Sequence, residues 1–188
     1  MVIKADIQLD ATGLACPMPI VKTKKVMAAL EEGRVLEVEA TDKGSKADLK
    51  AWAESTGHQY LGTVEEGDVL RHYLRKSSGE EKEERSFPHT ISNEELEQKL
   101  SANDPFVILD VREEAEFAFS HIQDAVNIPL GELEERLGEI DNDQPVFVVC
   151  RTGSRSDLAC QKLVEKGFKN VKNVVPGMSK WNGKKESL

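Results

Sequence analysis

Long hydrophobic runs are missing from this chain of 188 residues. Its longest apolar stretches, such as residues 145–150, are far shorter than the roughly 20 residues that a helix needs to cross a bilayer. The N-terminus also lacks a basic stretch followed by an apolar block, so it predicts no secretory signal. The sequence therefore predicts a globular protein with no membrane partner, and we expect it in the cytoplasm.

Cysteine is scarce as well. Cys16, Cys150 and Cys160 are an odd number without the paired spacing of a secreted disulfide scaffold, so free thiols are expected. Acidic residues outnumber basic ones, 34 to 25, and the formal net charge of −9 argues against nucleic acid as a partner. The four histidines show no ligand spacing with one another or with cysteine, so neither a metal nor another cofactor is expected.

Residues 1–76 alternate between strand and helix patterns. Period-two alternation predicts strands at 2–9, 35–40, 58–64 and 68–75. Helical spacing predicts one helix over 17–30 and a second from a cap at Asp42 through Trp52, which ends at Gly57. The order β-α-β-α-β-β is typical of a two-layer α/β sandwich, with one sheet and two helices.

Residues 77–86 contain no apolar side chain and therefore have nothing to bury. We interpret them as an acidic, flexible linker between two domains. The alternative is a solvated helix end that continues the preceding element.

Residues 87–188 predict a second domain of a different kind. Ser92 and Glu95 form a capping box before a helix that runs to Leu100. Further helices are expected over 156–166 and on a face shared by Leu133, Leu137 and Ile140, and apolar strands over 106–109, 146–149 and 171–175. Continuous apolar strands between helices are typical of a parallel sheet covered on both faces, so this domain is α/β.

The most informative segment, Cys-Arg-Thr-Gly-Ser-Arg-Ser at 150–156, lies between a predicted strand end and a predicted helix start. Ligands bind at the carboxyl ends of strands in open parallel sheets. Backbone N–H groups, the helix dipole and two arginines, Arg151 and Arg155, should favour the thiolate form of Cys150 and hold an anion beside it. The segment therefore predicts a reactive cysteine in an anion-binding loop.

The resemblance to the rhodanese (thiosulfate sulfurtransferase) family covers residues 89–181. The family's active-site loop has the pattern Cys-Arg-x-Gly-x-Arg-Ser, and similar signatures occur at 110–112, 116–117, 121–122, 127–129, Gly177 and Trp181. The resemblance implies that Cys150 takes sulfane sulfur from a donor, becomes a persulfide and passes the sulfur on. The donor, thiosulfate or a small persulfide, would bind to the rest of the loop, namely Arg151, Thr152, Gly153, Ser154 and Arg155. Asp110 and Arg112 are expected to support the fold through charge-assisted hydrogen bonds.

A cysteine phosphatase is the competing interpretation of such a loop, with five residues between cysteine and arginine. Only four residues separate Cys150 from Arg155, which leaves the loop one residue too short to encircle a phosphate. We therefore favour sulfur transfer.

Cys16 begins a Cys-Pro-x-Pro motif with Pro17 and Pro19. Proline suits the first turn of a helix, so Cys16 should precede a helix start, where a thiolate is favoured. With residues 9–13, Asp42, Trp52, Gly57 and His58, the motif resembles the TusA/SirA-like sulfur-carrier family over nearly all of residues 1–76. The resemblance implies a persulfide on Cys16 that is exchanged with a partner protein. An exposed cysteine at a helix cap remains the structural alternative.

We thus predict a fusion of a sulfur carrier with a sulfurtransferase, in which Cys150 and Cys16 both carry sulfur and protein donors and acceptors take part. Two alternatives remain open. In one, the first domain only docks a partner while Cys150 works alone. In the other, the protein is a persulfide-sensing interaction module without turnover, in which modification of Cys16 changes binding to a partner. Cys160 lies on an apolar helix stripe and is expected to pack in the core, with a resolving role for Cys150 as the other possibility.

Overall fold

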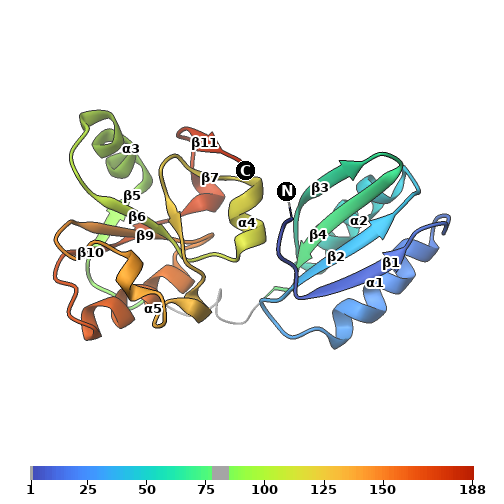
Figure 1. Cartoon of the computed structure of the whole chain (residues 1–188), viewed down its shortest axis with the longest axis horizontal. Helices are drawn as coiled ribbons and strands as arrows, with labels where there is room; N and C mark the ends of the chain where they lie inside the picture. The colour runs from blue at the N-terminus through green and yellow to red at the C-terminus, as the bar shows by residue number, and fades with distance from the viewer. Residues whose placement is uncertain (1, 78–84) are drawn as a thin grey trace. The chain divides into compact units, whose positions relative to one another are not determined.

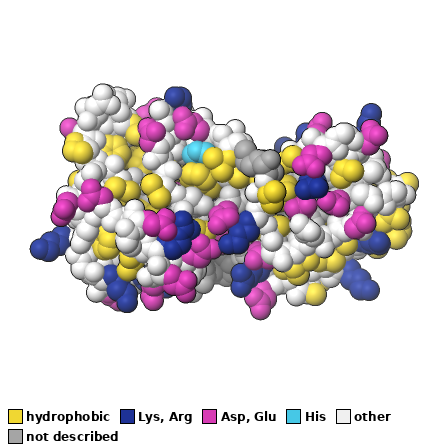
Figure 2. All heavy atoms as spheres, in the orientation of Figure 1, with side chains coloured by type: hydrophobic (Ala, Val, Ile, Leu, Met, Phe, Trp, Pro, Cys, Tyr) yellow, Lys and Arg dark blue, Asp and Glu magenta, His cyan; other side chains and the backbone are white. Residues whose placement is uncertain are grey.

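The computed structural model describes residues 2–77 and 85–188, and the chain divides into two compact units, Met1–Gly79 and Glu80–Leu188 (Figure 1). Most of the predicted linker, residues 77–86, lies outside the described residues, which include only Ser77, Arg85 and Ser86 of that segment. Lys and Arg side chains are scattered among Asp and Glu side chains on the face shown in Figure 2.

The first unit is the predicted two-layer α/β sandwich, with β1 and β2 parallel and the other neighbours antiparallel in the sheet order β1-β2-β4-β3. Its core joins Met27 and Leu30, from the first helix and its C-cap, to Leu49 of the second helix and to Leu36 and Val38 of the central sheet. The elements in chain order are β1 (Ile7–Ala11), α1 (Met18–Ala29), β2 (Val35–Ala40), α2 (Ser45–Thr56), β3 (Gln59–Glu66) and β4 (Val69–Arg75).

The start of β1 and the start of α2 differ from the prediction. Strand β1 begins at Ile7 because the carboxylate of Asp6 accepts the Val35 N–H at 2.8 Å, which ends the strand ladder there. Asp42 does not cap α2. Its carboxylate accepts the Gly44 N–H within a turn, and the helix starts at Ser45. The helix ends at Thr56, with Gly57 as its C-cap, as predicted.

The second unit is built on a parallel sheet of order β5-β10-β9-β6-β8 (Figure 1). Alternate residues of β9 enter different core clusters, Val146 and Val148 in one and Phe147 and Val149 in the other, so both faces of the sheet are covered as predicted. The elements are β5 (Thr90–Ser92), α3 (Asn93–Ala102), β6 (Val107–Asp110), α4 (Glu114–Phe119), β7 (His121–Ile122), β8 (Val126–Asn127), η2 (Leu130–Glu132), η3 (Leu137–Glu139), β9 (Val146–Val149), α5 (Ser154–Glu165), β10 (Val171–Val175), η4 (Met178–Lys180) and β11 (Lys185–Glu186).

The predicted helix through Leu133, Leu137 and Ile140 is wrong. The structure has two short 3-10 turns there, η2 and η3, each with the sequence Leu-Gly-Glu. A glycine in each turn costs about 1 kcal/mol of helix stability, and burial of Leu133 and Ile140 needs no regular helix. The capping box at Ser92 and Glu95 is confirmed in both of its hydrogen bonds.

No helix within residues 2–77 and 85–188 is long and apolar enough to span a membrane.

Candidate active site

The loop that follows β9 occupies the carboxyl end of the sheet's middle strand. Cys150 is the first residue after β9, and Ser154 begins α5. Gly153 is the N-cap of α5 and has φ of 95°, a conformation that glycine adopts without strain. The structure therefore has the predicted order at this point: a strand, the loop that begins with Cys150, and the N-terminus of a helix.

The backbone carbonyl groups of this loop are held on its outer side. The carbonyl oxygen of Cys150 accepts the Met178 N–H, and that of Arg151 accepts the Ser179 N–H, both at 2.9 Å. The carbonyl oxygen of Gly153 accepts the Asn173 side-chain amide at 3.0 Å. C=O and N–H point in opposite directions across a trans peptide, so the N–H groups that follow these carbonyls point away from these donors. Backbone N–H groups in a loop before a helix N-terminus are typical of anion-binding sites.

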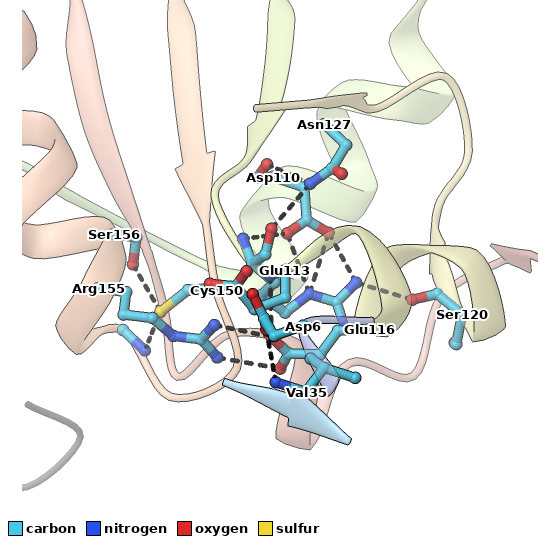
Figure 3. Close-up of polar contacts among 12 residues, drawn as sticks. Asp6, Val35, Asp110, Glu113, Glu116, Ser120, Asn127, Cys150, Arg155 and Ser156 are labelled. Atoms are coloured by element: carbon cyan, nitrogen blue, oxygen red, sulfur yellow. Dashed lines mark hydrogen bonds and ion pairs between the residues drawn. The ribbon is translucent and has the colours of Figure 1, made fainter. Parts of the chain in front are cut away.

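Figure 3 shows the Cys150 sulfur beside the Ser156 side chain. Its Sγ accepts the Gly153 N–H at 3.1 Å and lies 3.2 Å from Ser156 Oγ. The residue is 1% exposed. The loop therefore places a sulfur atom where backbone N–H groups can stabilise negative charge on it.

Arg155 does not turn towards the sulfur in the way the sequence suggested. Its guanidinium makes two hydrogen bonds to the Glu116 carboxylate on α4, at 2.7 and 3.0 Å, and both side chains are buried (Figure 3). The charge of Arg155 is thus balanced by Glu116 behind the loop. Arg151 is half-buried, and the hydroxyl of Thr152 is buried without a hydrogen-bond partner among the described residues.

Asp110 and Arg112 lie together at the end of β6. The Arg112 guanidinium donates to both carboxylate oxygens of Asp110 and also to the Ser120 carbonyl oxygen at 2.7 Å. Asn127 donates to the backbone carbonyl oxygens of both residues. These bonds fix the strand beside β9, and none of those described reaches the Cys150 sulfur.

Cys16 is exposed and lies just before α1. Pro17 is the N-cap of α1, and Pro19 is buried and accepts the Thr23 hydroxyl with its carbonyl oxygen. A hydrogen bond with the Asp48 carboxylate on α2, aided by the charges of Asp48 and Asp42, raises the pKa of the Cys16 thiol. The sequence predicted that the helix start would favour the thiolate, and the two carboxylates reverse that effect.

Cys160 is fully buried on α5 in the same core cluster as Cys150. Burial raises the pKa of its thiol, so it is a poor nucleophile in the folded protein. Among residues 2–77 and 85–188, His, Cys, Asp and Glu side chains form no group of three or more that could hold a metal ion.

Two residues that hold the Cys150 loop were not predicted. Asn173 on β10 bonds to Gly153 and to Ser156, and Asn93 on α3 bonds to both backbone groups of Gly177. Both are ordinary polar residues in the sequence, and only the packing of β10 and α3 in the fold brings them to the loop.

Family models match both units. The model for sulfurtransferase TusA matches residues 7–76, and the model for the rhodanese-like domain matches residues 92–184. A protein of Bacillus subtilis (strain 168) named "Putative sulfur carrier protein YrkF" is 53% identical over 97% of this chain and 99% of its own length. The sulfur carrier protein TusA of Allochromatium vinosum is 44% identical over 38% of this chain and 95% of its own.

Among solved structures, a rhodanese-like domain protein from Staphylococcus aureus matches 53% of this chain and 98% of its own. It is 30% identical, with a TM-score of 0.50.

Proposed function

This chain belongs to the family of sulfur carrier proteins in which a TusA domain precedes a rhodanese-like sulfurtransferase domain, and we propose that it takes sulfane sulfur onto Cys150 and relays it to or from Cys16. The donor is thiosulfate or a small persulfide, and the reaction takes place in the cytoplasm. The observation that carries the proposal is the position of the Cys150 sulfur, which accepts a backbone N–H within the anion-binding loop.

The chemistry of loading follows from that position. The Cys150 thiolate attacks the outer sulfur of thiosulfate, the S–S bond of the donor breaks, and sulfite leaves with the bonding electron pair. The product is a Cys150 persulfide whose terminal sulfur is negative. The Gly153 N–H, which already donates to the Cys150 sulfur, and neighbouring backbone N–H groups stabilise this charge without reorganisation. In this proposal Arg151, Thr152, Gly153 and Ser154 bind the donor, and Arg155 supports the loop from behind through Glu116.

The relay step uses the second thiol. The Cys16 thiolate attacks the terminal sulfur of the Cys150 persulfide, a new S–S bond forms at Cys16, and Cys150 leaves as a thiolate. The same step in reverse loads Cys150 from Cys16. Cys16 is exposed, which suits a residue that exchanges sulfur with a protein donor or acceptor.

The Asp48 carboxylate raises the pKa of the Cys16 thiol, which disfavours the thiolate. A protonated thiol is a poor nucleophile. The carrier cysteine is thereby protected from unspecific reaction until a partner group displaces or neutralises the carboxylate.

The test is a pair of matched variants of the full chain. Cys150→Ser should abolish sulfur transfer from thiosulfate to cyanide, because serine keeps the shape but is a far weaker nucleophile. Cys16→Ser should leave that reaction nearly unchanged, since cyanide is small enough to reach Cys150 directly. Activity retained in Cys150→Ser would remove the proposal.

Mass spectrometry of the loaded protein tests the relay. Sulfur loaded on Cys150 should appear on Cys16 in a single turnover, at a rate independent of protein concentration because both thiols share one chain. If Cys16 never acquires sulfur from Cys150 or from a partner, the first domain is a docking or sensing module instead.

A further inference from the structure

The hydroxyl of Ser156 lies between the Cys150 sulfur and a buried amide. Ser156 Oγ is 3.2 Å from Cys150 Sγ and 2.6 Å from Asn173 Oδ1. Ser156 and Asn173 are both 0% exposed, so water does not compete for these bonds. The donor of each of these hydrogen bonds can therefore be assigned.

The assignment starts from the Gly153 carbonyl oxygen, which can only accept. The Asn173 atom 3.0 Å from it must be the amide nitrogen, so the other end of the amide is the oxygen Oδ1. An amide oxygen also only accepts, and Ser156 therefore donates its single hydroxyl hydrogen to Asn173. The remaining bond runs the other way: the thiol of Cys150 donates to Ser156 Oγ.

This arrangement suits the thiol and not the thiolate. Once Cys150 has lost its proton, its negative sulfur faces a lone pair of Ser156 Oγ at hydrogen-bond distance. Rotation of the Ser156 hydroxyl about its Cβ–Oγ bond removes the conflict without moving any heavy atom. A hydrogen bond to a charged group is roughly twice as strong as a neutral one, and this difference favours the rotated hydroxyl when the sulfur is ionised.

We propose that Ser156 is a hydrogen-bond switch for the reactive sulfur, whose hydroxyl donates to Asn173 while Cys150 is a thiol and to the sulfur when Cys150 is ionised. The inference rests on the proposed role of Cys150 as nucleophile. The thiol proton passes to solvent, no covalent bond at Ser156 forms or breaks, and the hydroxyl returns when the sulfur is protonated again. Asn173 is a positioning residue, because its amide N–H keeps its hold on Gly153 in both states.

Other charged and titratable groups lie around the loop, and a test must hold them constant. They come from the loop, from α5, from α4 and from the segment next to Gly153, and are Arg151, Arg155, Asp157, Cys160, Glu116 and Arg85. Substitution of Ser156 leaves all of them in place.

The decisive variant is Ser156→Ala in the full chain. The measurement is the rate of Cys150 alkylation by iodoacetamide against pH, with the modified peptide quantified by mass spectrometry. If the hydroxyl turns to the thiolate, its loss should move the pH midpoint upwards by about 0.5–1 unit, the difference between a charged and a neutral hydrogen bond. If the hydroxyl stays on Asn173, its loss removes only an acceptor for the thiol, and the midpoint should fall. A fall or an unchanged midpoint overturns the proposal.

Ser156→Thr keeps a hydroxyl and should keep the midpoint close to that of the parent protein. A merely structural role for Ser156 would lower the alkylation rate at every pH and leave the midpoint in place. Thermal unfolding of both variants shows that the second unit remains folded at the assay temperature.

Asn173→Leu tests the other side of the switch, because leucine has nearly the same shape and no polar group. Without its resting acceptor, the Ser156 hydroxyl should stay on the sulfur and lower the midpoint. The loss of the bond to Gly153 changes the loop as well, so the effect of Asn173→Leu is compared with its effect in the Ser156→Ala background. Asn173→Leu should lower the pH midpoint of alkylation only when Ser156 is present. An equal shift in the midpoint with and without Ser156 overturns the role of Asn173.

The alkylation assay separates this inference from the proposed function, since it measures the thiol and not turnover. If Cys150→Ser retains sulfur transfer, the proposed function fails whatever the midpoints are. If Cys150→Ser is inactive and Ser156→Ala does not raise the midpoint, only the switch fails.

Discussion

Gly177 packs against the reactive loop so closely that one added methyl group should displace it. A Cβ at Gly177 would lie 2.5 Å from the Cys150 carbonyl oxygen and 3.1 Å from that of Arg151. Both obstacles are backbone atoms, so no side-chain rotation can relieve the contact. The Asn93 amide holds the N–H and the C=O of Gly177, which prevents the peptide from turning away.

The cost of Gly177→Ala has two parts. The backbone at Gly177, with φ of 89° and ψ of −160°, is essentially restricted to glycine, and an alanine there costs about 1–3 kcal/mol. The overpacking against the loop adds about 1–3 kcal/mol. The second unit should therefore lose about 2–6 kcal/mol of stability. Movement of the Cys150 backbone should also slow thiosulfate-to-cyanide transfer by roughly 10- to 100-fold, since reaction rates fall steeply with misplacement of the nucleophile.

The matched control is Gly167→Ala. Gly167 also has a positive φ, 96°, but its Cβ would meet no atom within 4 Å, so only the backbone cost of about 1–2 kcal/mol applies and transfer should be unchanged. Urea unfolding of the full chain measures both variants in a Trp52→Phe background, where Trp181 alone reports on the second unit. Equal stability losses at the two glycines, with transfer unchanged at both, would refute the idea that Gly177 positions the loop.

Two further predictions concern charge. Arg155→Met should destabilise the second unit by about 3–5 kcal/mol in urea unfolding, because it removes the guanidinium that pairs with the buried Glu116 carboxylate. The double variant Arg155→Met, Glu116→Gln should recover much of this stability. If Arg155→Met is as stable as the parent protein, the ion pair is not buried in solution. Asp48→Asn should lower the pKa of the Cys16 thiol by removing the carboxylate that raises it, so Cys16 should be alkylated faster at pH 7. Asp42→Asn should have a smaller effect. An unchanged alkylation rate in Asp48→Asn would contradict the hydrogen bond between Asp48 and Cys16.

Regular periodicity made most of the fold predictable. The apolar run of β9 and the alternation of β2 each place neighbouring residues in a buried sheet, and these patterns do not depend on distant parts of the chain. The helix ends at Gly57 and Gly167 could also be predicted from the local sequence, because each glycine takes a positive φ just past the last helical turn. The helix predicted through Leu133 was wrong because periodicity alone was used. The apolar spacing there is helical, but two glycines keep the segment from forming a regular helix.

The site was predictable only in part. The position of Cys150 between a strand and a helix N-terminus follows from a few consecutive residues. The partner of Arg155 does not, because Glu116 comes from a helix 39 residues away along the chain, and the sequence alone suggested that the arginine faces the anion. The carboxylates that raise the pKa of Cys16 were likewise missed, because Asp48 reaches the thiol only once α2 packs beside α1.

The carboxylate of Asp157 bears on where the second unit can be separated from the rest of the chain. It accepts the backbone N–H groups of Ser86 and Phe87, at 3.0 and 2.8 Å, and the side-chain amide of Gln161. The rhodanese-like match begins only at residue 92, yet a fragment that starts there would lack both backbone N–H donors to this carboxylate, which lies in the first turn of α5. An autonomous catalytic fragment should therefore begin no later than Arg85, and gene fusions or truncations that keep the fold should preserve the two residues ahead of Pro88.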